Sequence, residues 1–138
     1  MGLNAELLYA RIHEIEQSLE RLDEIATVSQ ETFLSNPDLK DIACYRLIVA
    51  IESALQICFH ISSKLLKKVP DSYSDCFGLL EEGDILPKEL STKLRQMARF
   101  RNLLIHMYWQ VDYERVYEFI QNSRGDLREF ISLIRSLI

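Results

Sequence analysis

The stretch KLRQMARFRNLLIHMYWQV, residues 93–111, decides how the rest of this chain is interpreted. Drawn as a helix, it has two faces. Apolar residues recur at a spacing of three and four and form one stripe: Met97, Phe100, Leu104, Met107 and Val111. Polar residues recur at the same spacing on another face: Arg95, Arg99, Asn102, His106 and Gln110. The apolar face suits a protein core, and the polar groups suit a phosphodiester.

Length and composition favour one globular, helical domain. The chain has 138 residues, of which 48% are hydrophobic and 27% are charged, as in globular rather than disordered proteins. Only 4 Gly and 3 Pro are present, so turns are few and the elements are long, which favours helices. We therefore expect a single domain over residues 1–138.

Charge and cysteine usage argue against several classes of protein. The chain carries 16 Lys and Arg against 21 Asp and Glu, a net charge of −5, which does not suit a general nucleic-acid coat or a membrane-surface protein. A local basic site remains compatible, because residues 88–101 hold five basic residues and one Glu, a sum of +4. Three cysteines without CxxC spacing are interpreted as reduced thiols in apolar surroundings.

The sequence indicates no metal, cofactor, leader or membrane span. No carboxylate or Cys/His cluster has metal-ligand spacing, and Cys58 and His60 lie on different faces of one helix. Residues 1–10 lack the basic and apolar regions of a signal peptide. No stretch approaches about 18 uncharged apolar residues. We expect a cytoplasmic protein.

Helical periodicity predicts an antiparallel bundle of four long helices and one short helix. The first helix covers residues 3–34, with Asn4 as its cap, and ends at a turn where Pro37 precedes a capping Asp38. The second covers residues 39–68 and is apolar almost all round, so it is either central or covered by a second copy of the protein.

The second half of the chain holds the remaining three helices. A short helix follows a capping Ser72 and stops at Gly83. The helix of residues 93–111 begins at Pro87 or Ser91 and lasts to about Trp109. Asp112 caps the last helix, residues 113–138, in which residues 122–125 are expected to introduce a kink because of a glycine.

Two polar residues of the second helix stand apart from their apolar neighbours. Glu52 is either the partner of an arginine from residues 93–111 or part of a narrow wet strip with Gln56 and Ser63. His60 is interpreted as a partly exposed or hydrogen-bonded structural residue rather than a catalyst.

The segment RNLLIHMYW, residues 101–109, fits the pattern R-x4-H-x-Y and resembles the signature of the HEPN superfamily, in its HepT-like toxin branch. The resemblance extends over residues 72–134, including the ILP loop, the MARFRN lead-in and the VDYERVYEFI helix. The N-terminal half is similar more loosely, in its helix layout and its apolar second helix.

The resemblance implies a helical bundle that forms a homodimer, with the two R-x4-H motifs meeting at a cleft between subunits. It implies a metal-independent ribonuclease toxin that acts on RNA, encoded beside a nucleotidyltransferase antitoxin that transfers AMP to the motif tyrosine. On this basis Arg101 and His106 are catalytic and Tyr108 is the modified residue. Asn102, Arg99 and Arg95 are supporting residues, and Arg99 is an alternative to Arg101 for the catalytic role.

The motif carries a geometric difficulty. At about 100° per residue, an ideal helix places Arg101 and Tyr108 some 20° apart but His106 well over 100° from both. Either the helix is distorted, or side chains reach around it, or two protomers assemble the cleft. We favour the last, because the apolar residues 42–66 offer a surface that a dimer would bury.

Three functions from different classes compete. The first is the ribonuclease toxin. In it, a neutral histidine takes the proton of the ribose 2′-OH, and a protonated histidine gives a proton to the leaving oxygen. Arginine stabilises the negative charge of the phosphorane. The second is a non-catalytic helical substrate-binding subunit of a nucleotidyltransferase. The third is a dimeric helical scaffold with a solvated polar stripe. The joint presence of Arg101, His106 and Tyr108 favours the first.

Overall fold

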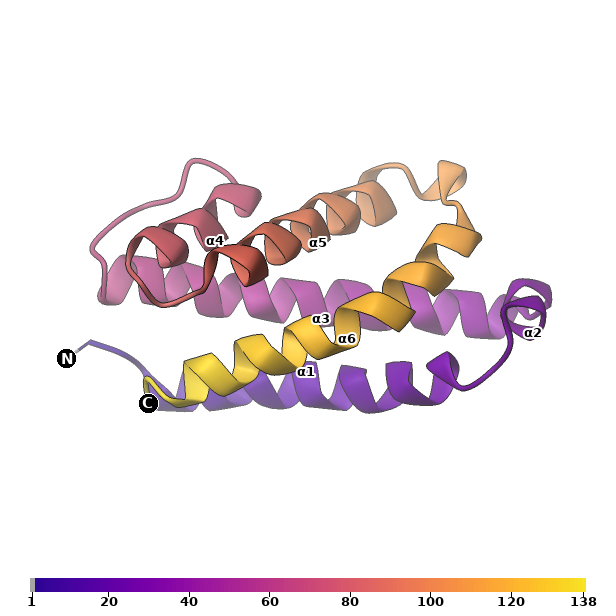
Figure 1. The fold of residues 1–138 in the computed structure, drawn as a ribbon, viewed down its shortest axis with the longest axis horizontal. Coiled ribbons are helices and arrows are strands. Elements are labelled where there is room, and N and C mark those ends of the chain that lie inside the picture. Colours follow the sequence, from indigo (N-terminus) through magenta and orange to yellow (C-terminus); the bar gives the residue numbers. More distant parts are fainter. Residues whose placement is uncertain (1) are drawn as a thin grey trace.

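The computed structural model describes residues 2–138 as an all-helical bundle (Figure 1). Its elements are α1 (Ala5–Ala26), α2 (Gln30–Ser35), α3 (Pro37–Lys64), α4 (Tyr73–Glu82), α5 (Lys88–His106), a 3-10 turn η1 (Tyr108–Gln110) and α6 (Tyr113–Arg135). The four long helices alternate in direction along the long axis, and the two termini lie at the same end. The all-α antiparallel bundle is confirmed, with α2 and α4 as short helices beside the four long ones.

The prediction of one helix over residues 3–34 is wrong, because the chain breaks after Ala26 and restarts as α2. Ser29 caps α2, its hydroxyl accepting a hydrogen bond from the Thr32 amide at 3.1 Å. Side chains of α6 bind the carbonyls at the break: Gln121 Nε2 donates to Ala26 at 2.9 Å, and Tyr117 donates to Val28 at 2.6 Å. A neighbouring helix therefore satisfies the backbone groups that the break leaves free.

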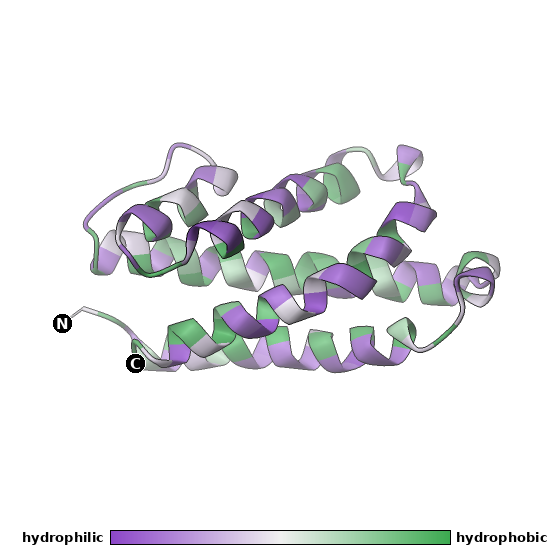
Figure 2. Ribbon diagram, viewed as in Figure 1, coloured by the Kyte–Doolittle hydropathy of each residue, from purple (hydrophilic) through white to green (hydrophobic). Residues whose placement is uncertain are grey.

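Helix α3 is the centre of the bundle and packs against α1, α4, α5 and α6. Figure 2 shows its apolar composition along much of its length. Within residues 2–138 it is the one helix long and apolar enough to cross a membrane, which corrects the expectation of no such stretch. Half of that window is buried inside the bundle, as in a core helix of a globular protein.

Most predicted caps are confirmed, and one is corrected. The side chains of Asn4, Ser72 and Asp112 accept hydrogen bonds from the first turns of α1, α4 and α6. At α3 the cap is Asn36 rather than Asp38, because Asn36 Oδ1 accepts from two backbone amides, at 3.0 and 3.2 Å. Pro37 then occupies the first helical position, where its missing N–H costs nothing.

Helix α6 continues without interruption past Gly125 and ends at Arg135 rather than at residue 138. Two side chains of α6 hold it to α1 on either side of this glycine. Arg124 and Arg128 both donate to Asp23, at 2.7 and 2.5 Å. Tertiary contacts thus support a continuous helix through a residue of low helix propensity.

The helix of residues 93–111 ends earlier than predicted. Its last helical residue is His106, and Met107 leaves the helix with φ −129° and ψ 39°. The predicted stripe therefore holds only in part: Met97, Phe100 and Leu104 are buried, whereas Met107 is 36% exposed. Phe100 stacks on Phe119 of α6 at 4.3 Å between ring centroids, and this contact anchors the C-terminal half of α5 in the core.

Candidate functional site

Arg101 is the most constrained residue of the motif. Only 8% of it is exposed, and its guanidinium points from α5 toward α3 and α4. Nη2 donates to Glu52 of α3, and Nη1 donates to Asn102 Oδ1 at 2.8 Å. The ring of Tyr73 on α4 lies 5.0 Å from the guanidinium carbon, a cation–π contact. Three helices therefore fix the position of this one charge.

The pair of Glu52 and Arg101 settles one of the open alternatives. Glu52 is the partner of an arginine from α5, and its side chain is still 30% exposed. Burial lowers the pKa of the Arg101 guanidinium, which stays protonated because arginine titrates far above neutral pH. Its Nε–H is buried without a hydrogen-bond partner in the structure. The carboxylate compensates the buried positive charge, because an unpaired one would be costly.

A cleft of about 620 Å³ opens beside this pair. Glu52, Gln56 and Phe59 of α3 form one wall, the segment of residues 70–74 forms another, and Asn102 closes it. Phe59 and Tyr73 meet edge to face across it at 5.7 Å between ring centroids. The cleft is thus lined by two carboxylates, from Glu52 and Asp71, by two amides and by an aromatic pair, next to the buried arginine.

His106 and Tyr108 lie at the C-terminal end of α5, not inside the cleft. His106 is exposed as the last helical residue, and Tyr108 is 70% exposed in the η1 turn. Had the helix continued, Tyr108 would follow Arg101 by seven residues and face the bundle. Ending the helix at His106 turns Tyr108 outward. Three explanations were open for the geometry of the motif: a distorted helix, side chains that reach around it, or a cleft built by two protomers. The end of the helix at His106 is a departure from the ideal helix, and it explains the outward position of Tyr108 within one chain.

Asn102 connects the two parts of the motif. It accepts from Arg101, and His106 follows it by four residues, one turn further along the same face of α5. Within residues 2–138, no hydrogen bond joins the side chains of His106 or Tyr108 to Arg101. One chain therefore brings Arg101, Glu52 and Asn102 together and leaves His106 and Tyr108 open to another molecule.

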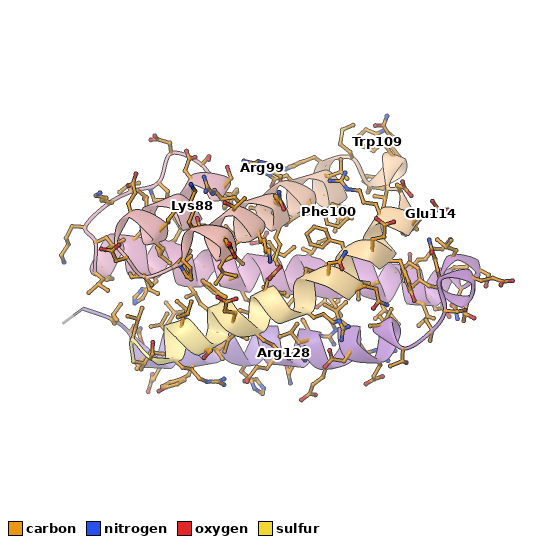
Figure 3. All side chains as sticks on the ribbon, viewed as in Figure 1. Lys88, Arg99, Phe100, Trp109, Glu114 and Arg128 are labelled. Carbon is orange, nitrogen blue, oxygen red and sulfur yellow. The ribbon has the colours of Figure 1, made fainter. Side chains whose placement is uncertain are left out.

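The other two predicted arginines have different surroundings. Arg99 is exposed on the outer side of α5 (Figure 3), and within the described residues it forms no ion pair. It precedes His106 by seven residues and so shares its face. Arg95 donates to Glu81 of α4 at 3.2 Å and to the Ser91 carbonyl at 3.4 Å. Arg95 thus ties α4 to α5, and Arg99 is the freer cation.

Histidine and cysteine residues outside the motif have structural surroundings. His60 Nε2 accepts the Asn4 amide at 2.9 Å, which confirms its structural interpretation, and burial, with Lys64 nearby, lowers its pKa. Cys44, Cys58 and Cys76 are free thiols. Burial raises the pKa of Cys44 to about 11 and that of Cys58 still further. Within residues 2–138, no group of three His, Cys, Asp or Glu residues has the placement of a metal site.

Sequence reasoning missed Tyr73, which contacts Arg101 and lines the cleft. Tyr73 begins α4, 28 residues before Arg101 in the chain, so no helical spacing relates the two. The pairing of Glu52 with an arginine of α5 could be predicted, because a lone carboxylate in an apolar run needs a partner. A tyrosine in the capping region of a short helix carries no such signal.

Comparison with known proteins identifies the family. The model of the family described as ribonuclease HepT-like matches residues 15–134. This chain belongs to the HepT-like ribonuclease family. Among its relatives, the mRNA nuclease HepT of Shewanella oneidensis is 24% identical over 131 residues, which are 95% of this chain and 98% of the relative. The tRNA nuclease HepT of Aphanizomenon flos-aquae is 28% identical over 134 residues, which cover 96% of this chain and 90% of the relative.

Solved structures share the fold of this HepT-like ribonuclease. The tri-AMPylated Shewanella oneidensis HEPN toxin, in complex with its MNT antitoxin, superposes with a TM-score of 0.88 at 24% identity and covers 97% of this chain and 99% of its own. The cytosolic protein YutE of Bacillus subtilis superposes with a TM-score of 0.87 at 17% identity, and the match covers 99% of this chain and 91% of YutE. The six helices and their order are therefore a family architecture.

Proposed function

We propose that this HepT-like ribonuclease is a metal-independent endoribonuclease toxin of the cytoplasm, neutralised by a nucleotidyltransferase antitoxin. The observation that carries the proposal is the arrangement at α5. Arg101 is held by Glu52 and Asn102, and His106 stands exposed one turn beyond Asn102. The relatives named as nucleases and the neighbour crystallised with an antitoxin support the same function.

The proposed reaction uses groups that this chain supplies. The ribose 2′-oxygen attacks its own phosphorus, a new O–P bond forms, and the bond to the 5′-oxygen breaks. A neutral His106 takes the 2′ proton, and a protonated His106, from a second copy, gives a proton to the 5′-oxygen. Arg101 stabilises the charge on the phosphorane, with Arg99 as the alternative cation. The products are a 2′,3′-cyclic phosphate and a 5′-hydroxyl.

Two copies are therefore part of the proposal. The outward stripe of α3 offers a surface for a homodimer, since Tyr45 is 60% exposed and Val49 and Phe59 are only partly buried in the single chain. Glu52 and Gln56 lie on the same stripe and line the cleft. A second copy seated on this stripe would bring its own motif toward the cleft.

Tyr108 is the proposed site of silencing. Its ring is 70% exposed, so its hydroxyl is open to a partner enzyme. Transfer of AMP from a nucleoside triphosphate forms a bond between the tyrosine oxygen and the α-phosphorus and releases pyrophosphate. The added phosphate places negative charge two residues from His106, where an RNA phosphate would otherwise approach.

Cleavage of RNA by the purified protein tests the activity. Wild type should cut total RNA with EDTA present, and His106→Ala should not, because no other side chain replaces the imidazole. His13→Ala is the matched control, since His13 is an exposed histidine on α1, and it should cut like wild type. Equal cleavage by His106→Ala would remove His106 from the mechanism, and inhibition of wild type by EDTA would contradict a metal-independent reaction.

Intact mass tests the modification. Co-expression with a cognate nucleotidyltransferase antitoxin should add one or more AMP groups to wild type and none to Tyr108→Phe, because phenylalanine lacks the accepting oxygen. Tyr9→Phe is the control, since Tyr9 is also exposed, at 51%, and it should be modified normally. An AMP adduct on Tyr108→Phe would assign the modification to another residue.

A further inference from the structure

The most exposed aromatic pair in the described part of the chain lies beside His106. Tyr108 is 70% exposed and Trp109 is 64% exposed, and no residue of their turn is buried. Figure 3 shows Trp109 at the edge of the molecule, on the connection between α5 and α6. Exposing two large aromatic rings together forgoes the favourable burial of apolar area. A clustered pair of this kind marks a candidate contact surface for another molecule.

The pair is held in place rather than carried on a long loop. Helix α5 ends at His106, and Asp112 caps α6 by accepting from Glu114 N at 3.0 Å. Between them the Gln110 amide donates to the Met107 carbonyl at 2.9 Å. Both ends of this connection are fixed by helices of the bundle. The two rings are consequently presented in a defined position.

The ring geometry leaves aromatic faces open. The ring centroids of Tyr108 and Trp109 are 5.3 Å apart, and the planes are inclined at 82°. In an edge-to-face pair, the ring that contributes its edge keeps both faces free, and the other ring keeps one. A planar group can stack on such a face without displacing either ring.

We infer that Trp109 is a nucleobase-stacking platform for the RNA strand whose phosphate lies at His106. The inference rests on the proposed function. Trp109 follows His106 by three residues, so their backbones are within about 10 Å, which a short oligonucleotide spans. A base flanking the scissile phosphate stacks on the indole and positions the strand.

Charge explains why this protein needs such a platform. Its net charge is −5, so a broad phosphate-neutralising surface does not supply the affinity for RNA. Stacking of a base on an aromatic side chain contributes without net charge, and it accepts any base because every base has a π-face. Arg99 adds one exposed cation on the same face of α5 as His106.

The platform also bears on silencing. An AMP group on Tyr108 carries its own adenine, and Trp109 is the next residue in the chain and in contact with the tyrosine ring. The attached adenine occupies the indole that an RNA base would use. Modification therefore covers the platform and adds negative charge in a single step.

Fluorescence provides a direct test, because Trp109 is the single tryptophan of the chain. The full-length His106→Ala protein, shown by intact mass to carry no AMP, is titrated with a single-stranded RNA of about eight nucleotides. Stacking should quench the indole emission. An abasic strand with the same phosphates should leave the emission unchanged, and quenching by both strands alike would overturn the inference.

Variants separate stacking from structure. In the His106→Ala background, Trp109→Leu should weaken RNA binding about tenfold or more, and Trp109→Phe should restore part of it. With His106 intact, Trp109→Leu should raise KM more than it lowers kcat and leave Tm unchanged. Tyr9→Leu, which removes an exposed ring from α1, is the matched control and should have no effect on either binding or cleavage.

The remaining outcomes distinguish this inference from the proposed function. If wild type cleaves RNA while Trp109→Leu keeps the same KM, only the platform is overturned. If wild type does not cleave any RNA but RNA still quenches Trp109, the platform stands as a binding site and the nuclease function fails. An indole emission that depends on protein concentration without RNA would place Trp109 between two copies of the chain and overturn the inference.

Discussion

At the scale of single residues, two arginines of α5 differ in what they are free to do. Arg101 is enclosed by Glu52, Asn102 and Tyr73, so it is a charge fixed in position. Arg99 is exposed on the outer side of the same helix. An enclosed arginine suits a preorganised site, because it needs no rearrangement when charge develops on the phosphate. An exposed arginine suits the attraction of RNA from solution.

Replacing each arginine by alanine should separate these roles. Arg101→Ala leaves the half-buried Glu52 carboxylate unpaired, and we expect a loss of about 2–3 kcal/mol in the free energy of unfolding, together with loss of cleavage. Arg99→Ala should change that free energy by less than about 0.5 kcal/mol and weaken cleavage most at low salt, with the difference from wild type shrinking as salt is raised. Urea unfolding followed by circular dichroism, and cleavage assays on the same preparations, measure both effects.

The paired variants also provide the control. Glu52→Gln keeps a hydrogen-bond acceptor for Arg101 but removes the charge, so it should retain more stability than Arg101→Ala and lose part of the activity. Equal destabilisation by Arg99→Ala and Arg101→Ala would show that the enclosure of Arg101 adds no stability.

At the scale of elements, the ends of helices decide what the site exposes. α5 stops at His106 without a glycine or proline, at the run Met107 to Val111 that precedes the Asp112 cap of α6. Aromatic and β-branched residues in that run are weak helix formers. The cap of the next helix also needs an extended backbone at Asp112, which a longer α5 could not provide. The consequence is an exposed Tyr108 and Trp109 rather than two further buried positions.

The start of α1 depends on pH through His60. Its neutral Nε2 accepts the Asn4 amide, and burial, with Lys64 nearby, lowers its pKa below the ordinary 6.5. A group with a lowered pKa stabilises the fold fully above its unfolded pKa and loses that contribution as pH falls through the folded pKa. Lowering the pH from about 7.5 to 5 should therefore weaken the attachment of the α1 N-terminus.

Nuclear magnetic resonance checks this expectation. The His60 ring should titrate below 6.5, and the protection factor of the Asn4 amide, which compares its exchange rate with that of an unfolded peptide at the same pH, should fall as the pH is lowered over the same range. His60→Gln, which cannot titrate, should remove the pH dependence of the protection factor at Asn4. A His60 ring that titrates at or above its ordinary value would contradict the prediction.

At the scale of the whole molecule, the bundle buries α3 on the inside but leaves a stripe of it uncovered. Tyr45, Val49 and Phe59 lie on this stripe, beside the cleft at Glu52. We expect Tyr45→Glu to convert a homodimer to a monomer, because it places a charge in an apolar interface. Light scattering coupled to size-exclusion chromatography measures the mass, and cleavage should fall with dimer content.

Tyr9→Glu is the matched control for the dimer, since Tyr9 is a similarly exposed tyrosine on α1. It should leave mass and cleavage unchanged. A Tyr45→Glu protein that remains dimeric would move the interface away from this stripe, and a monomer with full activity would show that one chain is sufficient for catalysis.

The sequence alone determined the class of fold, most helix caps and the placement of Arg101, Asn102 and His106 on one helix, because helical periodicity and capping act over a few residues. Tertiary structure decided the rest. Residues of α6 hold the break after Ala26 open, Glu52 pairs with Arg101 across 49 positions, and Tyr73 encloses the same guanidinium. These outcomes depend on which helices pack together. Hydrogen bonds within a helix link residues only four positions apart, so they carry no information about the packing of helices that are distant in the sequence.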